Sequence, residues 1–66
     1  MINSKLDINI GNIIEYNYSY SNEESKIGLV YKIVKDLNFS YMLYLIDSNN
    51  QEDIVPFNIL EYKIIN

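Results

Sequence analysis

The chain has 66 residues, a formal net charge of −4 and a hydrophobic content of 48%. A single domain of this size buries only about 60% of the surface that its unfolded chain exposes, so its margin of stability is small. The sequence contains no cysteine and no histidine, which excludes disulfides and zinc sites of these residues as a source of stability. Its apolar residues are rich in isoleucine and tyrosine, which favours β-strands and argues against intrinsic disorder.

The charge and the apolar pattern also bear on partners and location. All five basic residues are lysines, against nine acidic residues, so we do not expect nucleic acid to be a partner. No apolar run approaches the about 18 residues that indicate a membrane span. Residues 1–10 interrupt their apolar side chains with polar ones and lack the apolar segment of an export signal. We therefore expect a protein that is not secreted and does not contact a membrane.

Residues 1–9 predict an N-terminal arm, and residues 10–66 predict the folded domain. The arm carries a few apolar residues, including Ile8, among polar neighbours, which is enough to dock it but not enough to predict a strand. Residues 10–12 read Ile-Gly-Asn, a turn signal that places the first strand directly after them.

Residues 13–19 predict the first strand, because they are β-branched or aromatic with polar residues between them. If this strand is regular, three alternate tyrosines share one face. They are Tyr16, Tyr18 and Tyr20. Residues 21–25 are polar throughout, so we expect an exposed loop there.

Residues 26–35 and 39–47 predict the two strands of a central hairpin. Both faces of each strand are partly apolar, which is typical of a bent strand shared between two layers of a small barrel. Regular alternation in the first of these strands places Ile27, Leu29, Tyr31 and Ile33 on one face and Gly28, Val30, Lys32 and Val34 on the other. Gly28 marks a bend or the close approach of another backbone, and residues 36–38 supply the turn.

The last third of the chain predicts two further strands. Residues 48–53 are a polar connection, and residues 54–55 predict a short strand that ends at Pro56, because proline favours an edge or a strand end. Residues 57–59 are expected to form one 3₁₀ turn. Residues 60–65 predict the final strand. Its alternate residues on one side are Leu60, Tyr62 and Ile64.

This succession of short strands resembles the SH3-like barrel. Residues 55–61, Val-Pro-Phe-Asn-Ile-Leu-Glu, are similar to the SH3 segment in which a proline and an asparagine frame a 3₁₀ turn before the final strand. Residues 10–16 and 26–30 look like the corresponding runs of small phage-encoded SH3-like proteins. The resemblance implies an all-β fold, a small five-stranded antiparallel SH3-like barrel over residues 10–66. Residues 26–30 are also similar to the KOW motif of ribosomal and transcription-factor barrels, which implies binding to RNA or polymerase.

No motif in the chain indicates catalysis or a cofactor. Residues 47–53 are similar to a calcium loop, but Glu52 stands where that loop requires glycine and Asn58 where it requires glutamate, so we expect no metal. The adjacent carboxylates at 23–24 and 52–53 point in different directions and are interpreted as solvated. Because neither a nucleophile motif nor a convergent acid and base pair is present, we expect no enzyme activity.

The tyrosines are the most informative candidates for a binding surface, because tyrosine buries a large ring while its hydroxyl remains available to water or a partner. The candidate interface residues are Tyr16, Tyr18, Tyr20, Tyr44 and Phe57. The alternative is that most tyrosines only cap a small barrel, with their hydroxyls outside.

The sequence therefore predicts a non-enzymatic protein–protein interaction module. The resemblance implies a small phage-type accessory or virion component in the cytoplasm of the host cell or in the virion, which contacts a protein partner or self-associates. One alternative is a host-directed inhibitor, or a sponge that sequesters a small ligand. A further alternative is a KOW-like module that binds RNA or polymerase.

Overall fold

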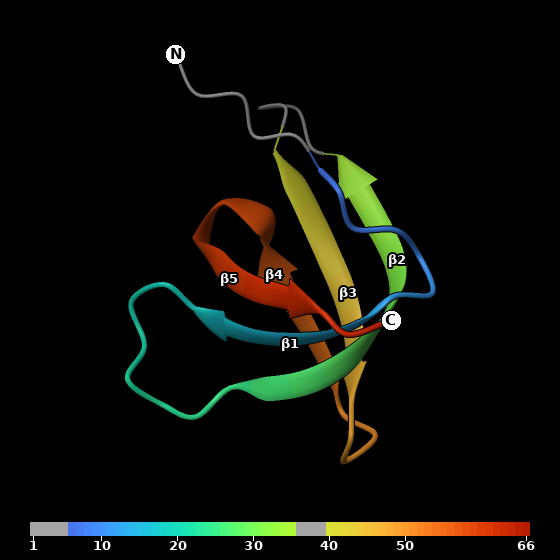
Figure 1. Cartoon of the computed structure of the whole chain (residues 1–66). Helices are drawn as coiled ribbons and strands as arrows, with labels where there is room; N and C mark the ends of the chain where they lie inside the picture. Colours follow the sequence, from blue (N-terminus) through green and yellow to red (C-terminus); the bar gives the residue numbers. More distant parts are fainter. Residues whose placement is uncertain (1–5, 36–39) are drawn as a thin grey trace.

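The computed structural model describes residues 6–35 and 40–66, which form one antiparallel β-sheet (Figure 1). The strands are β1 (Ile13–Tyr18), β2 (Lys26–Lys35), β3 (Tyr41–Asp47), β4 (Glu52–Pro56) and β5 (Leu60–Ile64), with the 3₁₀ turn η1 (Phe57–Ile59) before β5. Their order in the sheet is β4-β3-β2-β1-β5. The prediction of an all-β fold with five antiparallel strands is confirmed.

The sheet is curled but not closed. Strands β4 and β5 are its two edges, and in the described part of the chain no ladder pairs them with each other. Since η1 joins β4 directly to β5, the two edges meet at one corner of the sheet (Figure 1). The predicted barrel is therefore not closed, and the sheet is open and strongly curved.

The core fills the concave side of this sheet. Its members are the inward-facing apolar residues of all five strands and one residue before them: Ile8, Ile14, Tyr16, Val30, Leu43, Leu45, Val55 and Leu60. Each fully buried side chain of this size contributes about 1.5–3 kcal/mol. Ile8 belongs to the predicted arm, so this part of the arm packs into the core rather than merely lying beside it.

A β-bulge breaks the regular alternation predicted for residues 26–35. Val30 pairs with Leu45, but the next pair joins Lys32 to Tyr44, so Tyr31 is an extra residue on β2. The predicted faces of β2 are therefore wrong beyond Val30: the extra residue moves Ile33 to the inner side, where it packs against the core. A bulge adds a residue and bends its strand.

Gly28 marks a close approach, as one of its two predicted roles requires. A Cβ at this position would lie 3.1 Å from Cε1 of Tyr16 and 3.3 Å from the carbonyl oxygen of Ile46. A side chain at this position would therefore force the Tyr16 ring or the Ile46 backbone to shift by a few tenths of an ångström. The irregularity in the strand falls instead at the bulge.

The turn before β4 explains the main difference at a strand end. Strand β4 begins at Glu52, two residues earlier than predicted, because Asp47 closes the preceding turn: its Oδ1 accepts hydrogen bonds from the backbone N–H groups of Asn49 and Gln51, both at 2.9 Å. Pro56 ends an edge strand, as predicted.

Other predicted elements follow the structure closely. The turn at residues 10–12 contains Gly11 with a φ of 100°, a conformation that favours glycine. The 3₁₀ turn at 57–59 is confirmed. The predicted turn at 36–38 and the first residue of the strand predicted at 39–47 lie outside the described residues.

Candidate functional site

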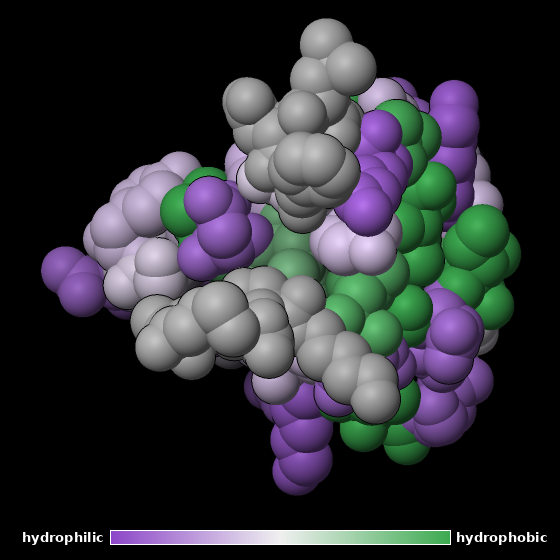
Figure 2. All heavy atoms as spheres, turned by 90° about the horizontal axis from the view of Figure 1, so that it is seen from above, coloured by the Kyte–Doolittle hydropathy of each residue, from purple (hydrophilic) through white to green (hydrophobic). Residues whose placement is uncertain are grey.

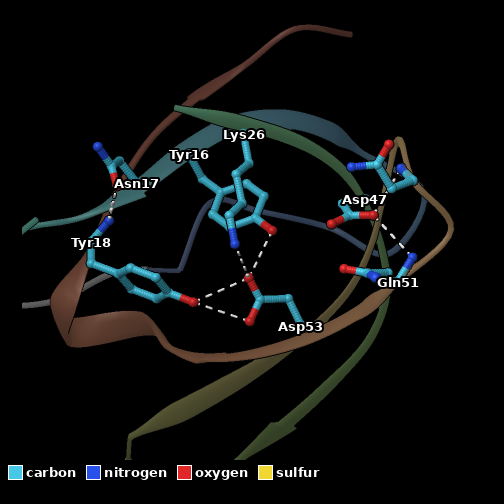
Figure 3. A network of polar contacts seen from close by, with 8 residues as sticks. Tyr16, Asn17, Tyr18, Lys26, Asp47, Gln51 and Asp53 are labelled. Atoms are coloured by element: carbon cyan, nitrogen blue, oxygen red, sulfur yellow. Dashed lines mark hydrogen bonds and ion pairs between the residues drawn. The ribbon is translucent and has the colours of Figure 1, made fainter. Parts of the chain in front are cut away.

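A group of polar side chains converges on Asp53 inside the curled sheet (Figure 3). The Tyr16 hydroxyl donates a hydrogen bond to Asp53 Oδ2 at 2.9 Å. The Tyr18 hydroxyl lies 3.0 Å from Oδ1 and 3.1 Å from Oδ2 of the same carboxylate. Lys26 Nζ lies 3.7 Å from Oδ2 and forms an ion pair. We call these four residues the Asp53 cluster.

The sheet register brings the Asp53 cluster together. Tyr16 and Lys26 are direct cross-strand partners on β1 and β2, and Tyr18 follows Tyr16 on the same face of β1. Asp53 occupies an inward position on β4, opposite Leu45 of β3. Strands β2 and β3 separate β1 from β4 in the sheet, so the two tyrosines reach across the curl and connect strands that share no ladder.

The environment keeps both tyrosine hydroxyls protonated. Burial, and then the hydrogen bond to the Asp53 carboxylate, raise the pKa of Tyr18 to about 12. The same two causes raise the pKa of Tyr16 still further. A phenol that remains protonated donates to a carboxylate, and such charge-assisted bonds contribute about 1.5–3 kcal/mol each. The Asp53 cluster therefore stabilises the curl of the sheet.

Asp53 is the member of this cluster that sequence reasoning interpreted wrongly. The sequence predicted a solvated carboxylate in a loop, but the Asp53 side chain is only 21% exposed and lies within β4. Two signals were present in the sequence. Asp53 lies two residues before the apolar Val55 and therefore on the same face of the strand. The tyrosines of β1 also need acceptors for their hydroxyls when their rings are buried. Neither signal identifies the partner without the curl of the sheet.

A concavity of about 500 Å³ opens beside the Asp53 cluster. Its lining comes from β1, the start of β2 and the loop between them: Tyr16, Asn17, Tyr18, Asn22, Glu23, Glu24 and Lys26. The loop is held by the Asn17 side chain, whose Nδ2 donates to the Glu23 carbonyl at 2.6 Å, and by Ser21 Oγ, which accepts from the Glu23 N–H at 3.0 Å. The Asn17 bond joins the loop to β1, and the Ser21 bond lies within the loop.

An aromatic pair lies next to this concavity. The rings of Tyr18 and Tyr20 stack with centroids 5.7 Å apart and planes inclined by 12°. Tyr20 is 74% exposed because β1 ends at Tyr18, so Tyr20 lies in the turn rather than on the strand. The stack extends the aromatic surface from the inside of the sheet to solvent.

The charge of the concavity is negative. Glu23 and Glu24 are both exposed on its loop, and within the described residues the ion pair of the structure joins Lys26 to Asp53 rather than to either glutamate. The concavity thus presents two carboxylates beside an aromatic surface.

The five predicted interface residues do not form one surface. Tyr16 is 1% exposed and belongs to the core, so its ring is not accessible in the folded sheet. Tyr18 lines the concavity, and Tyr20 stacks on the Tyr18 ring. Tyr44 lies on the opposite, outer side of the sheet, with Lys32 Nζ 5.1 Å from its ring centroid.

Phe57 occupies a third place. Its ring centroid lies 6.5 Å from that of Tyr41 and 5.8 Å from that of Tyr62, so Phe57, the first residue of η1, packs against the core. The Tyr62 hydroxyl in turn donates to Asp7, and burial followed by this hydrogen bond raises the pKa of Tyr62 to about 12. The structure thus uses a second tyrosine and aspartate contact to attach the predicted arm to β5.

Within residues 6–35 and 40–66, no three carboxylates gather in a way that could hold a metal ion. The same part of the chain contains no helix with the length and apolar character to cross a membrane. No family model, curated protein sequence or solved structure matches this chain.

Proposed function

We propose that the protein is a non-enzymatic contact module that binds a basic segment of a partner protein at the concavity beside Tyr18. The observation that supports this proposal is the half-buried Tyr18 ring, which stacks on the exposed Tyr20 ring and lines a concavity that also carries Glu23 and Glu24. Aromatic faces and nearby carboxylates together attract lysine and arginine side chains.

The charge of the whole chain favours the same class of partner. A net charge of −4 on 66 residues attracts basic segments over a distance of about 10 Å at moderate salt. At contact, an arginine side chain would stack on the ring of Tyr20 while its guanidinium donates to the loop carboxylates. Lys26 also lines the concavity and pairs with Asp53 at 3.7 Å, so Glu23, Glu24 and Asp53 together with Lys26 leave a net charge of −2 there.

The biological setting of this contact rests on the resemblance of residues 55–61 to the SH3 turn segment and of the early strands to small phage-encoded SH3-like proteins. That resemblance supports a phage-type accessory or virion component that works through protein contacts. Fold-level analogy alone carries this part of the proposal.

A titration with basic peptides tests the proposed site. We expect an arginine-containing peptide to bind with a Kd on the order of 100 µM at low salt and to shift the backbone amide NMR signals of residues 17–26. Replacing Glu23 and Glu24 with glutamine should weaken binding about fivefold to tenfold, because each rim carboxylate contributes up to about 1 kcal/mol. Tyr20→Ala should weaken it about threefold through the lost cation–π contact.

The matched control removes the same charge elsewhere. Glu52→Gln with Glu61→Gln takes two exposed carboxylates from the outer side of β4 and β5, and we expect less than about a twofold change in Kd. Equal weakening by both double variants would show attraction to net charge alone and would contradict the proposed site, as would an absence of amide shifts at low salt.

A further inference from the structure

The outer side of the sheet carries a continuous apolar surface that is separate from the concavity. It consists of outward-facing residues on four neighbouring strands: Ile13, Ile27, Leu29, Tyr31, Val34, Met42, Tyr44, Ile46 and Ile54. We call it the outer face. Figure 2 shows hydrophobic side chains gathered on the side of the molecule where β2 lies in Figure 1.

The register makes these residues direct neighbours. Leu29 lies between Ile13 of β1 and Ile46 of β3, with both of which it forms a cross-strand pair. Tyr44 pairs with Ile54 of β4. Leu29 is 42% exposed, so the centre of the outer face is open to solvent.

The bulge on β2 enlarges the outer face. Because Tyr31 is the extra residue, its exposed ring lies against that of Tyr44, with centroids 6.1 Å apart in an edge contact. Lys32 follows on the same side and lays its ammonium group over the Tyr44 ring. A lysine placed in this way leaves the aliphatic residues around Leu29 uncovered.

The size of the outer face corresponds to a small protein interface. Its four strands, about 4.8 Å apart, are about 19 Å wide, and the seven residues of β3 span about 23 Å, which together give about 440 Å². Contiguous apolar patches of about 300–600 Å² on small proteins are often functional. A standard stable interface buries about 800 Å² per partner, so this face fits a weaker complex.

The charges around the outer face indicate what covers it. Its outward charged positions are Glu15, Lys32, Glu52, Glu61 and Lys63. They comprise three carboxylates and two ammonium groups, for a net charge of −1 on this side of a chain whose net charge is −4. Two copies of an acidic chain repel each other least where both signs are present.

We infer that a second copy of this chain docks on the outer face and forms a two-fold dimer centred on Leu29. Such an isologous contact lets each copy bury the same apolar residues and place its lysines near the partner's carboxylates. The concavity on the inner side remains open in this dimer, so the dimer and the proposed peptide site are independent.

Sedimentation over a range of protein concentrations tests the dimer. We expect the mass to rise from the 7.8 kDa of one chain toward twice that value, with a Kd on the order of 100 µM. Leu29→Lys should keep the protein monomeric at the highest concentration. Ile10→Lys is the matched control, because Ile10 is 64% exposed but precedes the sheet, and we expect it to dimerise like the unchanged chain.

A second measurement does not depend on any variant. In a mixture of labelled and unlabelled unchanged protein, we expect intermolecular NMR contacts among the methyl groups of Leu29, Ile13 and Ile46. A chain that stays monomeric at about 1 mM, about tenfold above the expected Kd, would overturn the inference. So would a dimer without these contacts, or equal loss of dimer in the Leu29→Lys and Ile10→Lys variants.

Discussion

The two sides of the sheet are built from the same strands but differ in what covers their side chains: the concave side is packed, whereas the outer face is exposed to solvent. On the concave side, Tyr16 and Tyr18 bury their rings and Asp53 accepts both hydroxyls. On the outer face, Ile27 and Leu29 remain exposed on β2. Because successive side chains of a strand point to opposite sides of the sheet, one residue faces the packed, hydrogen-bonded interior and the next faces solvent.

Apolar character alone does not locate the core of such a small sheet. Both sides of β2 are apolar, and the curvature decides which side is covered. On the concave side, the side chains of a curled five-stranded sheet point toward one another and bury one another. On the outer face, they point away from one another, and in the described structure no other part of the chain covers Leu29.

The largest expected effect comes from one substitution made on each side. Leu45→Ala removes a fully buried side chain and should lower the free energy of unfolding by about 2–5 kcal/mol, which is enough to unfold much of a domain of this size. Leu29→Ala on the outer face should change it by less than about 1 kcal/mol. Urea unfolding at dilute concentration measures both, and equal losses would show that the two sides contribute alike.

A smaller effect is expected from neighbouring carboxylates on β4. Asp53→Asn removes the charge that accepts two phenol hydrogen bonds and should destabilise the fold by about 1–3 kcal/mol. Glu52→Gln, the adjacent outward residue, should change the free energy of unfolding by less than about 0.5 kcal/mol. If the two variants unfold at the same urea concentration, the Asp53 cluster does not stabilise the curl.

The smallest expected effect concerns alkaline pH. The ordinary pKa of Tyr18 is 10.0 and its pKa in the fold is about 12, so the folded state favours the protonated phenol. This stabilisation is complete below pH 10 and is lost as the pH rises from 10 to 12. Its size is about 1 kcal/mol, allowing for solvent screening.

The Tyr18→Phe variant isolates that contribution, because it cannot ionise at this position. Urea unfolding at neutral pH and near pH 11 should show a smaller loss of stability with pH in Tyr18→Phe than in the unchanged protein. Tyrosinate absorbance should also show one late-titrating phenol fewer. Parallel stability curves for the two proteins would contradict a stabilising role of the Tyr18 proton.

Much of the fold could be predicted from local pattern. The strand beginning at Ile13, the exposed loop at 21–25 and the 3₁₀ turn at 57–59 depend on neighbouring residue types, which the sequence displays directly. Strand β4 was predicted too short because Glu52 and Asp53 are polar. The turn that Asp47 closes ends at Gln51, so the strand begins at the next residue, Glu52.

The candidate site was predicted only in part. Tyr18 and Tyr20 were identified and lie together, but Tyr16 was grouped with them although it packs into the core. Residues on one face of a strand need not share one environment when the sheet curls around part of that face. The depth of each tyrosine depends on the strands opposite, which local pattern does not describe.

The β class, the five strands and the turns at 10–12 and 57–59 could be read from the sequence, because propensity and alternation act over a few residues. The tertiary structure alone decided that Asp53 meets Tyr16 and Tyr18, and that the bulge at Tyr31 moves Ile33 to the core side and adds an aromatic ring to the outer face. The physical reason is that curvature brings β1 opposite β4, across strands that separate them in the sheet, and no local pattern encodes that distance.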